Sequence, residues 1–460
     1  MARSVDLDGG KSMDLQRLRD RAVELLSGLI RIDTTNPPGD ELECARFLAG
    51  WLNDHGLPGR VYETEPDRGG AEALLPGDRD AAPIMLMGHL DVVPVGDRRA
   101  WTHDPFGGEV VDGCVWGRGA IDCKGVLAAQ AVALAEMARN GETTGRPVRL
   151  LAAPDEEVGG AAGVGWLTKH RRELVDCWCC VTEGGGEYYR LGGRGVATFM
   201  VGEKGQLRLD FTIRGRQGHA ALPGDEQAVY ILGELLTRLR KRPRVYRVLD
   251  VNVELLGLLT AGRPDGEALT AALESGDAAA WRELFAGPAA GAPEVVDALR
   301  AAYTDTLAPT IVHGGEKINI IPGRVALSCD CRLLPGTEPE ALLAELRTLA
   351  ADLPVEIEIS SSHPASVSDV AHPVVEVARR LVARWEPQSA FLPFLCPAGT
   401  DSRHLRWAGI DSYGYVPYPA DPLPADFNHR MHAVDERLEV DILERITARY
   451  LELVRELRRH

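Results

Sequence analysis

The stretch MLMGHLDVVP at residues 85–94 is an apolar run that ends in a histidine and an aspartate two residues apart. Its length and composition are typical of a buried β-strand. Residues i and i+2 of an extended backbone point to the same side, so His89 and Asp91 leave the end of this strand on one face. One ring nitrogen of His89 can then bind a metal ion while the carboxylate of Asp91 orients the ring through the other nitrogen. A buried histidine bonded to an aspartate without a metal is the alternative interpretation.

Two further apolar runs end in acidic residues in the same way. Residues 148–153 lead into Asp155-Glu156-Glu157, and residues 177–182 lead into Glu183. Segments with helical periodicity separate the runs, so we expect parallel strands joined by helices. The carboxyl ends of parallel strands meet at one edge of an open α/β sheet, and sites form there. The glycine-rich loop at 115–125 carries another acid, Asp122, which by itself could be only a helix N-cap.

The pattern changes after residue 204. Residues 207–213 alternate with period two, as in an antiparallel sheet with one face in water, and an amphipathic helix extends to about residue 240. The rest of this region predicts strands at 317–322, 325–333 and 355–360 and a helix at 338–352. The order strand, helix, strand, strand, helix, strand predicts a ferredoxin-like α+β domain. Residues 245–310 are alanine-rich and irregular, and we expect about two inserted helices there.

The length of 460 residues predicts more than one domain. We expect an α/β chain with a catalytic domain at 1–204 and 365–460, interrupted by an inserted domain at 205–364 that carries the extra segment 245–310. The net charge of −17 argues against nucleic acid or an anionic membrane as a partner. No run has the length of a membrane span or a signal peptide, so a cytoplasmic location is expected. The nine cysteines form no zinc-finger or disulfide pattern.

The candidate ligands are imidazoles and carboxylates rather than thiolates. This donor set suits zinc or a similar divalent ion, and several carboxylates in one place suit two ions. One shared carboxylate can bridge two ions about 3.5 to 4 Å apart, so that they hold both a water nucleophile and a substrate oxygen. The sequence therefore predicts a two-metal site at the carboxyl edge of the sheet.

Five motifs of the chain resemble the metallopeptidases that include aminoacylase, acetylornithine deacetylase, succinyl-diaminopimelate desuccinylase and glutamate carboxypeptidase. The motifs are GHLD at 88–91, GRGAID at 117–122, DEEVG at 155–159, GTDSR at 399–403 and HAVDE at 432–436. The resemblance extends from about residue 15 to the C-terminus and leaves out only 245–310. It implies a three-layer α/β/α zinc-peptidase-like catalytic domain with a ferredoxin-like lid and dimerisation domain.

The resemblance also implies a role for each residue of the metal site. His89, Asp122 and Glu183 match the ligands of one ion, and Asp122, Glu157 and His432 match those of the other. Two divalent ions are implied, zinc first, with cobalt or manganese as alternatives. Glu156 resembles the general base that takes a proton from the water and returns it to the leaving nitrogen, and Asp91 keeps its orienting role. His429, three residues before His432, is the alternative histidine of the last motif.

Further residues match positions that contact the substrate. His219 resembles a histidine that reaches the active site of a partner subunit and steadies the oxyanion, so a homodimer through the inserted domain is expected; an exposed loop histidine is the alternative. Asn319 and Arg332 match positions that hold a substrate carboxylate, and Gly399 and Thr400 match a loop that contacts the substrate backbone. A strand-surface charge is the alternative for Arg332. The resemblance also implies a cis peptide bond between Asp122 and Cys123.

The resemblance predicts hydrolysis of an amide bond in a small substrate with a free carboxylate. A glutamate at the position of Glu183 goes with deacylases and carboxypeptidases, so we expect an N-acyl amino acid or a short peptide as substrate. Hydrolysis of an N-carbamoyl amino acid is an alternative reaction. A catalytically silent relative that binds a ligand or serves as a scaffold is the alternative from another class.

Overall fold

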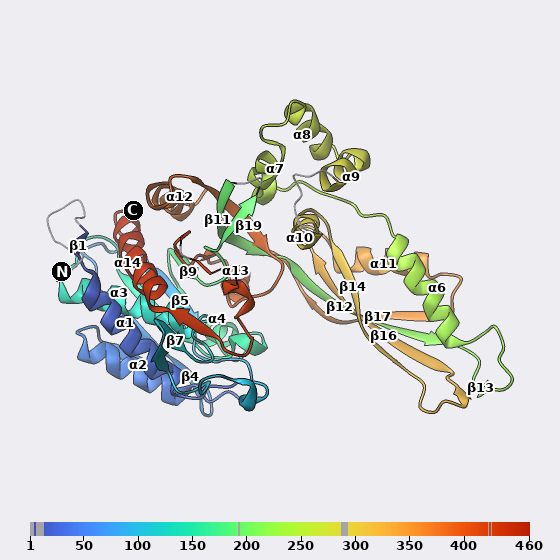
Figure 1. Ribbon diagram of the computed structural model, residues 1–460, viewed down its shortest axis with the longest axis horizontal. Coiled ribbons are helices and arrows are strands. Elements are labelled where there is room, and N and C mark those ends of the chain that lie inside the picture. The colour runs from blue at the N-terminus through green and yellow to red at the C-terminus, as the bar shows by residue number, and fades with distance from the viewer. Residues whose placement is uncertain (1–3, 6–12, 192–193, 287–292, 422, 425) are drawn as a thin grey trace. The chain divides into compact units, whose positions relative to one another are not determined.

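The apolar run before His89 is strand β5 (Ile84–His89), which lies inside a ten-stranded sheet in this computed structural model (Figure 1). It runs parallel to β8 (Val148–Ala153) on one side and to β9 (Cys179–Thr182) on the other. The register pairs His89 with Ala153 and Leu86 with Val181. The three strands therefore end at the same edge of the sheet, as the sequence predicted.

The sheet mixes parallel and antiparallel strands in the order β10-β11-β20-β9-β5-β8-β4-β3, and β18 and β19 also pair with β11. These strands are β3 (Gly59–Glu65), β4 (Arg68–Leu75), β10 (Tyr188–Leu191), β11 (Arg194–Glu203), β18 (Ser366–Val367), β19 (Ser389–Cys396) and β20 (Ser412–Gly414). A separate three-stranded sheet joins β6 (Glu109–Val111), β7 (Cys114–Trp116) and β21 (Arg437–Glu439). A two-stranded sheet joins β1 (Ser4–Val5) and β2 (Met13–Asp14).

Helices cover both faces of the central strands, which explains their continuous apolar runs. On one face, α3 (Lys124–Arg139) packs against β5 and contacts α1 (Leu15–Ile30) and α14 (Val440–Leu457) (Figure 1). On the other face, Met85, Met87 and Leu151 share a core with α4 (Val164–His170), α5 (Arg172–Val175) and α13 (Ser402–Trp407). Helix α2 (Leu42–Asp54) contacts β3 and β4, and α12 (Pro373–Trp385) contacts α14. This is the predicted three-layer α/β/α arrangement.

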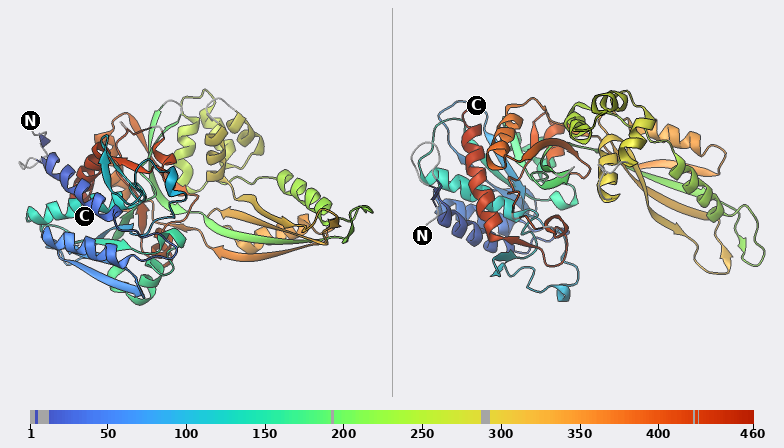
Figure 2. Two further views of the ribbon diagram at one scale, coloured as in Figure 1. Left: turned by 60° about the horizontal axis from the view of Figure 1, so that its bottom comes forward. Right: turned by 45° about the horizontal axis from the view of Figure 1, so that its top comes forward.

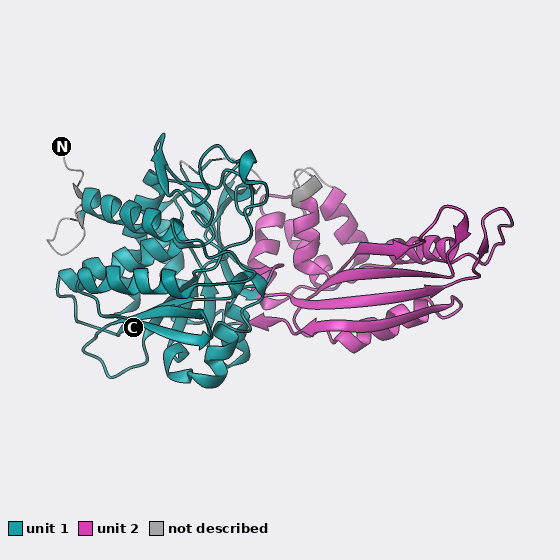
Figure 3. Ribbon diagram, turned by 90° about the horizontal axis from the view of Figure 1, so that it is seen from below, with its two compact units in different colours: residues 1–202, 368–394, 399–460 teal, residues 203–367, 395–398 magenta. Residues whose placement is uncertain are grey.

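The described residues are 4–5, 13–191, 194–286, 293–421, 423–424 and 426–460, so part of the N-terminal stretch that lacks a signal-peptide pattern lies outside them. Their contacts divide the chain into two units (Figure 3). Unit 1 comprises residues 1–202, 368–394 and 399–460, and unit 2 comprises 203–367 and 395–398. The domain limits expected at 204 and 364 stay a prediction. Within the described ranges, no helix combines the length and apolar character that a membrane crossing requires.

Unit 2 contains a four-stranded antiparallel sheet in the order β14-β16-β12-β17 (Figures 1 and 2). Its strands are β12 (Gly205–Arg214), β14 (Thr306–Gly314), β16 (Arg324–Leu333) and β17 (Val355–His363). Alternate residues of β12, among them Leu207 and Phe211, share a core with α6 (Ala228–Lys241) and α11 (Pro339–Leu349). The element order is the predicted β-α-β-β-α-β, with further helices inserted before β14.

Two predictions for unit 2 were wrong. The segment 245–310 forms four α-helices rather than two, namely α7 (Val253–Thr260), α8 (Gly266–Glu274), α9 (Ala278–Ala286) and α10 (Pro293–Tyr303); residues 287–292 lie outside the described ranges. In chain order, the second strand of the four-stranded sheet is β14 at Thr306–Gly314 and not the predicted strand at 317–322. Only Ile320–Ile321 of that predicted segment forms a strand, β15, which pairs with β13 (Gly218–His219). Ile318 is 97% exposed, so its apolar character did not report a buried strand.

Candidate metal site

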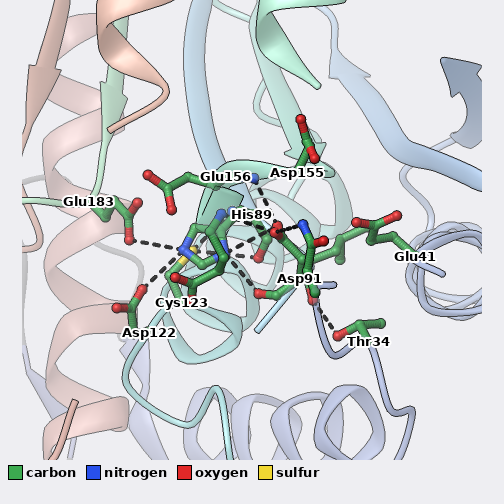
Figure 4. A network of polar contacts seen from close by, with 12 residues as sticks. Thr34, Glu41, His89, Asp91, Asp122, Cys123, Asp155, Glu156 and Glu183 are labelled. Atoms are coloured by element: carbon green, nitrogen blue, oxygen red, sulfur yellow. Dashed lines mark hydrogen bonds and ion pairs between the residues drawn. The ribbon is translucent and has the colours of Figure 1, made fainter. Parts of the chain in front are cut away.

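Asp122 lies between two imidazoles in unit 1. Its Oδ1 is 3.0 Å from Nε2 of His89, and its Oδ2 is 3.1 Å from Nε2 of His432. A second carboxylate approaches each imidazole, since Glu183 Oε2 is 3.4 Å from His89 Nε2 and Glu157 Oε2 is 3.4 Å from His432 Nε2. Figure 4 shows Asp122 and Glu183 converging on the ring of His89. The structure thus brings the five predicted ligand residues together as two groups that share Asp122.

Strand ends and adjoining turns position these side chains. His89 is the last residue of β5, Glu183 follows β9 directly, and Glu156 and Glu157 lie in a short 3-10 helix, Glu156–Val158, after β8. The loop before α3 supplies Asp122, and the expected cis peptide bond between Asp122 and Cys123 is present. His432 comes from the loop that precedes β21, and the structure places this histidine, rather than His429, beside Asp122.

The geometry and the donor atoms fit divalent ions. In a tetrahedral zinc site with metal-to-nitrogen distances of 2.0 to 2.1 Å, neighbouring donors lie roughly 3.3 Å apart. Oε1 of Glu157 is buried and has no hydrogen-bond partner among the described residues, so one ligand oxygen of this residue is left for an ion. The thiol of Cys123 lies against the same site, where its Sγ accepts a hydrogen bond from the N–H of His89 at 3.0 Å.

The electrostatics of the site also favour cations. Burial, with the opposing effect of His89 and the added effect of nearby Asp122, raises the pKa of Glu183 to about 7. Burial likewise raises the pKa of Glu156 well above its ordinary value, with Glu183 adding to the rise. Hydrogen bonding to Asp122 and to Glu157 raises the pKa of His432 to about 10. Several carboxylates therefore repel one another in a buried place, and bound cations would relieve this repulsion.

The carboxylate of Asp91 binds the turn that carries Glu156 and Glu157, whereas the sequence predicted that this carboxylate would orient the ring of His89. Its Oδ1 accepts the N–H of Glu156 at 3.1 Å, and its Oδ2 accepts the N–H of Glu157 at 3.0 Å and the side-chain amide of Asn36 at 2.8 Å. The ring of His89 instead places Nδ1 2.9 Å from the main-chain oxygen of Asp91, while the carboxylate lies 3.6 Å from Nδ1 (Figure 4). The backbone carbonyl of Asp91 orients the imidazole, and its carboxylate orients Glu156 and Glu157.

Three predicted substrate residues belong to unit 2. His219 and Asn319 are exposed neighbours, because β13 pairs with β15 and the N–H of Ala220 donates to the Asn319 carbonyl at 3.1 Å. Nδ1 of His219 accepts the N–H of Ala221 at 3.1 Å, which leaves the ring proton of the neutral form on Nε2. Arg332 is paired with Asp330 on its own strand, with Nε 2.8 Å from Oδ1, and Nη1 donates to the Pro397 carbonyl at 3.2 Å.

The loop that begins with Gly399 and Thr400 contains a residue that the sequence reasoning missed. Asp401 is 4% exposed, its Oδ1 has no hydrogen-bond partner among the described residues, and burial raises its pKa well above the ordinary value, with Asp91 adding to the rise. Farther along the loop, Arg403 Nη2 and His404 Nε2 both donate to the carbonyl of Gly159, at 2.7 and 2.8 Å. The only sequence signal for this buried acid was its place inside the GTDSR motif.

Comparisons with known proteins find a matching family model and related proteins. A family model described as "Peptidase family M20/M25/M40" matches residues 85–456. The "N-fatty-acyl-amino acid synthase/hydrolase PM20D1.1" of Danio rerio is 26% identical over 387 residues, which cover 82% of this chain and 73% of that protein. A succinyl-diaminopimelate desuccinylase of Methylorubrum extorquens is 28% identical over 443 residues, which cover 93% of this chain and 96% of that protein.

Solved structures share the fold at low sequence identity. The M20 family metallo-carboxypeptidase Sso-CP2 from Sulfolobus solfataricus has a TM-score of 0.67 at 18% identity, and the match covers 95% of this chain and 98% of that one. The Bacillus subtilis YXEP protein, described as a dinuclear metal binding peptidase from the M20 family, has a TM-score of 0.59 at 15% identity, with 96% and 99% covered. At these identities the likeness concerns the fold alone.

Proposed function

Because the chain belongs to peptidase family M20/M25/M40, whose members hydrolyse amide bonds, we propose that it is a two-metal hydrolase of N-acyl amino acids or short peptides with a free carboxylate. The observation that carries this proposal is the position of Asp122, which turns one carboxylate oxygen toward His89 and the other toward His432. A carboxylate shared in this way can bridge a pair of neighbouring ions.

Five side chains would hold the two ions. His89, Asp122 and Glu183 would hold one, and Asp122, Glu157 and His432 the other. Zinc suits these nitrogen and oxygen donors, and cobalt or manganese are the alternatives. Bound ions of this kind lower the pKa of a coordinated water towards about 7 and polarise a carbonyl oxygen.

Glu156 is the proposed general base. Its neighbour Glu157 faces His432, whereas none of the described residues forms an ion pair with the Glu156 carboxylate, whose pKa burial raises. A carboxylate with a raised pKa can take a proton from the attacking water and give it to the amide nitrogen. The water oxygen bonds to the carbonyl carbon first, the carbon–nitrogen bond breaks once the nitrogen holds the proton, and the products are an acid and a free amine. Asp91 supports this step by fixing the backbone of the turn that carries Glu156.

Four further residues would recognise the substrate. Arg332 and Asn319 would bind its free carboxylate, because a guanidinium pairs with a carboxylate through two parallel hydrogen bonds. Asp330 already takes the Nε edge of Arg332, so the substrate would compete with this aspartate or use the remaining donors. Gly399 and Thr400 would contact the substrate backbone. The relative from Danio rerio, an N-fatty-acyl-amino acid synthase/hydrolase, supports the acyl amino acid class.

The proposed enzyme is a cytoplasmic homodimer joined through unit 2. Support comes from β14, an edge strand of its sheet on which Ile311 and Val312 are 49% and 54% exposed. Helix α6 likewise exposes Val229 and Tyr230, by 49% and 61%. In such a dimer, His219 would present its Nε2 proton to the developing oxyanion of the partner's substrate. No nucleic acid or membrane partner is proposed.

A substrate panel on reconstituted protein tests this function. Metal-free protein is loaded with zinc, cobalt or manganese and assayed with N-acyl amino acids, dipeptides and N-carbamoyl amino acids. We expect amine release from acyl amino acids or dipeptides that a chelator abolishes and fresh metal restores. Ammonia release from carbamoyl substrates alone would replace the proposed substrate class. Ion binding without turnover of any substrate would indicate a silent relative.

A further inference from the structure

Two buried charged residues, Arg118 and Glu436, form an ion pair that contacts the backbones of His432 and Asp122. Nη1 of Arg118 lies 2.6 Å from Oε2 of Glu436, and their side chains are 2% and 0% exposed. The small sheet brings them together across more than 300 residues of sequence, because Arg437 on β21 pairs with Trp116 on β7. Arg118 follows β7 and Glu436 precedes β21.

Glu436 binds the backbone that leads into Asp122. Its Oε1 accepts the N–H of Ile121 at 2.9 Å and the N–H of Asp122 at 3.2 Å, while its Oε2 faces Arg118. A carboxylate that accepts two neighbouring N–H groups fixes the orientation of that peptide segment. Glu436 therefore holds the backbone of the residue that both ion groups share.

Arg118 binds the backbone of the other loop, which carries His432. Its Nη1 donates to the carbonyl of Ala433 at 3.1 Å, and its Nη2 donates to the carbonyls of His432 at 3.4 Å and Pro94 at 3.5 Å. One guanidinium thus holds two successive carbonyls of the loop in addition to Glu436. Only a fork of several donors can make these contacts at once.

The loop at 432–436 needs this support because of its backbone conformation. His432 has φ +61° and Asp435 has φ +63°, and such left-handed conformations cost free energy in residues with a Cβ. They persist where surrounding contacts determine them, and here Arg118 holds one end of the loop while Thr102 donates its N–H to Asp435 at 2.7 Å. The His432 side chain is itself 52% exposed, so packing around the ring contributes little to its placement.

We propose that the Arg118–Glu436 pair is a positioning device that sets the distance between Asp122 and His432 through their backbones. This inference rests on the proposed two-metal site. A buried ion pair contributes little net stability compared with apolar residues of similar size. Its hydrogen bonds to the two ligand segments give it a function that apolar residues could not supply. Arg118 binds the backbone of the loop that carries His432, whereas Glu436 binds the backbone of Asp122. We therefore predict that Arg118 supports the ion held by His432, and that Glu436 supports both ions through Asp122.

Metal titration of three variants tests the inference. Wild type, Arg118→Lys, Glu436→Gln and the control Glu136→Gln are freed of metal and titrated with Co²⁺, followed by calorimetry and by the visible absorption of the bound ion. Glu136 is a matched control, since it is 5% exposed, pairs with Arg17 at 2.8 Å and has no hydrogen bond to a proposed ligand. We expect Arg118→Lys to weaken one of the two binding events about 10- to 100-fold and to leave the other within threefold. Glu436→Gln should weaken both events, and Glu136→Gln neither.

The outcomes separate this inference from the proposed function. The positioning role would be overturned if the folded Arg118→Lys and Glu436→Gln proteins bound both ions with affinities within threefold of those of wild type. If wild type itself binds no pair of ions, the two-metal site fails and the inference falls with it. If a single substitution prevents folding, the double variant Arg118→Met with Glu436→Gln removes both charges together. Unchanged affinities in that folded double variant would also overturn the inference.

Discussion

Replacing Asp91 with asparagine should free the turn that carries the general base. The carboxylate of Asp91 is fully buried and uses one oxygen for the N–H of Glu156 and the other for the N–H of Glu157. An asparagine amide has one acceptor oxygen, so whichever way it turns, its NH₂ group faces one of these N–H groups. Asp91→Asn is nearly isosteric, and the change therefore removes a hydrogen bond without creating a cavity.

The size of the effect follows from the contacts that are lost. A buried donor left without a partner costs about 1 to 3 kcal/mol, and here a backbone N–H and the NH₂ group of the introduced asparagine both lack one, which gives about 2 to 6 kcal/mol. At 1.36 kcal/mol for each factor of ten, local opening of the turn becomes roughly 30- to 30,000-fold more frequent. Substitutions of residues that orient a metal site cost about 10- to 100-fold in activity, so kcat should fall by that factor.

Hydrogen exchange measured by mass spectrometry reports this opening directly. Peptides that cover residues 154–160 should exchange faster in Asp91→Asn, while peptides from unit 2 should not change. Asp305→Asn is a matched control, because Asp305 accepts the N–H of Leu334 at 2.6 Å within unit 2. That control should alter exchange near Leu334 alone. Unchanged exchange at 154–160, together with kcat within threefold of wild type, would refute the role given to Asp91.

Three other predictions concern the same site. Glu156→Gln should lower kcat by about 10² to 10⁴ while the protein still binds two ions, and loss of the ions would contradict the assignment of Glu156 as a base that does not bind metal. In metal-free protein, the pKa of His432 is about 10 when folded against an ordinary value of 6.5, so the folded state holds an extra proton between these pH values and stability should fall as the pH rises through that window. Chemical denaturation across this range should show that the free energy of unfolding declines less steeply with pH in His432→Gln than in wild type. An identical decline in the two proteins would count against the pairing of His432 with Asp122. Co-expression of His219→Ala with Glu156→Gln should restore part of the activity that each variant lacks alone, because a mixed dimer contains one complete site; no recovery would exclude a site shared between subunits.

The strands that carry the metal site could be predicted because their neighbours on both faces are apolar. The runs at 84–89 and 148–153 are almost entirely buried, so their composition reports their environment. Strand β14 escaped prediction because it is an edge strand whose residues from Ala308 onward are exposed, and so it shows no alternation. The segment at 317–322 misled for the opposite reason, since Ile318 is apolar and almost fully exposed. A pattern of apolar residues indicates a strand only where at least one face of that strand packs against a hydrophobic core.

The sequence by itself determined which kinds of side chain stand at the strand ends, and the family motifs pointed to the residues that would bind ions. Only the tertiary structure decided their pairing: each oxygen of Asp122 faces a different imidazole, the carboxylate of Asp91 binds backbone N–H groups, and Arg118 meets Glu436. The physical reason is that local sequence governs the conformation of a segment, whereas the direction of a hydrogen bond depends on what packing brings opposite it. Glu436 and Ile121 are 315 residues apart, and no local pattern encodes their contact.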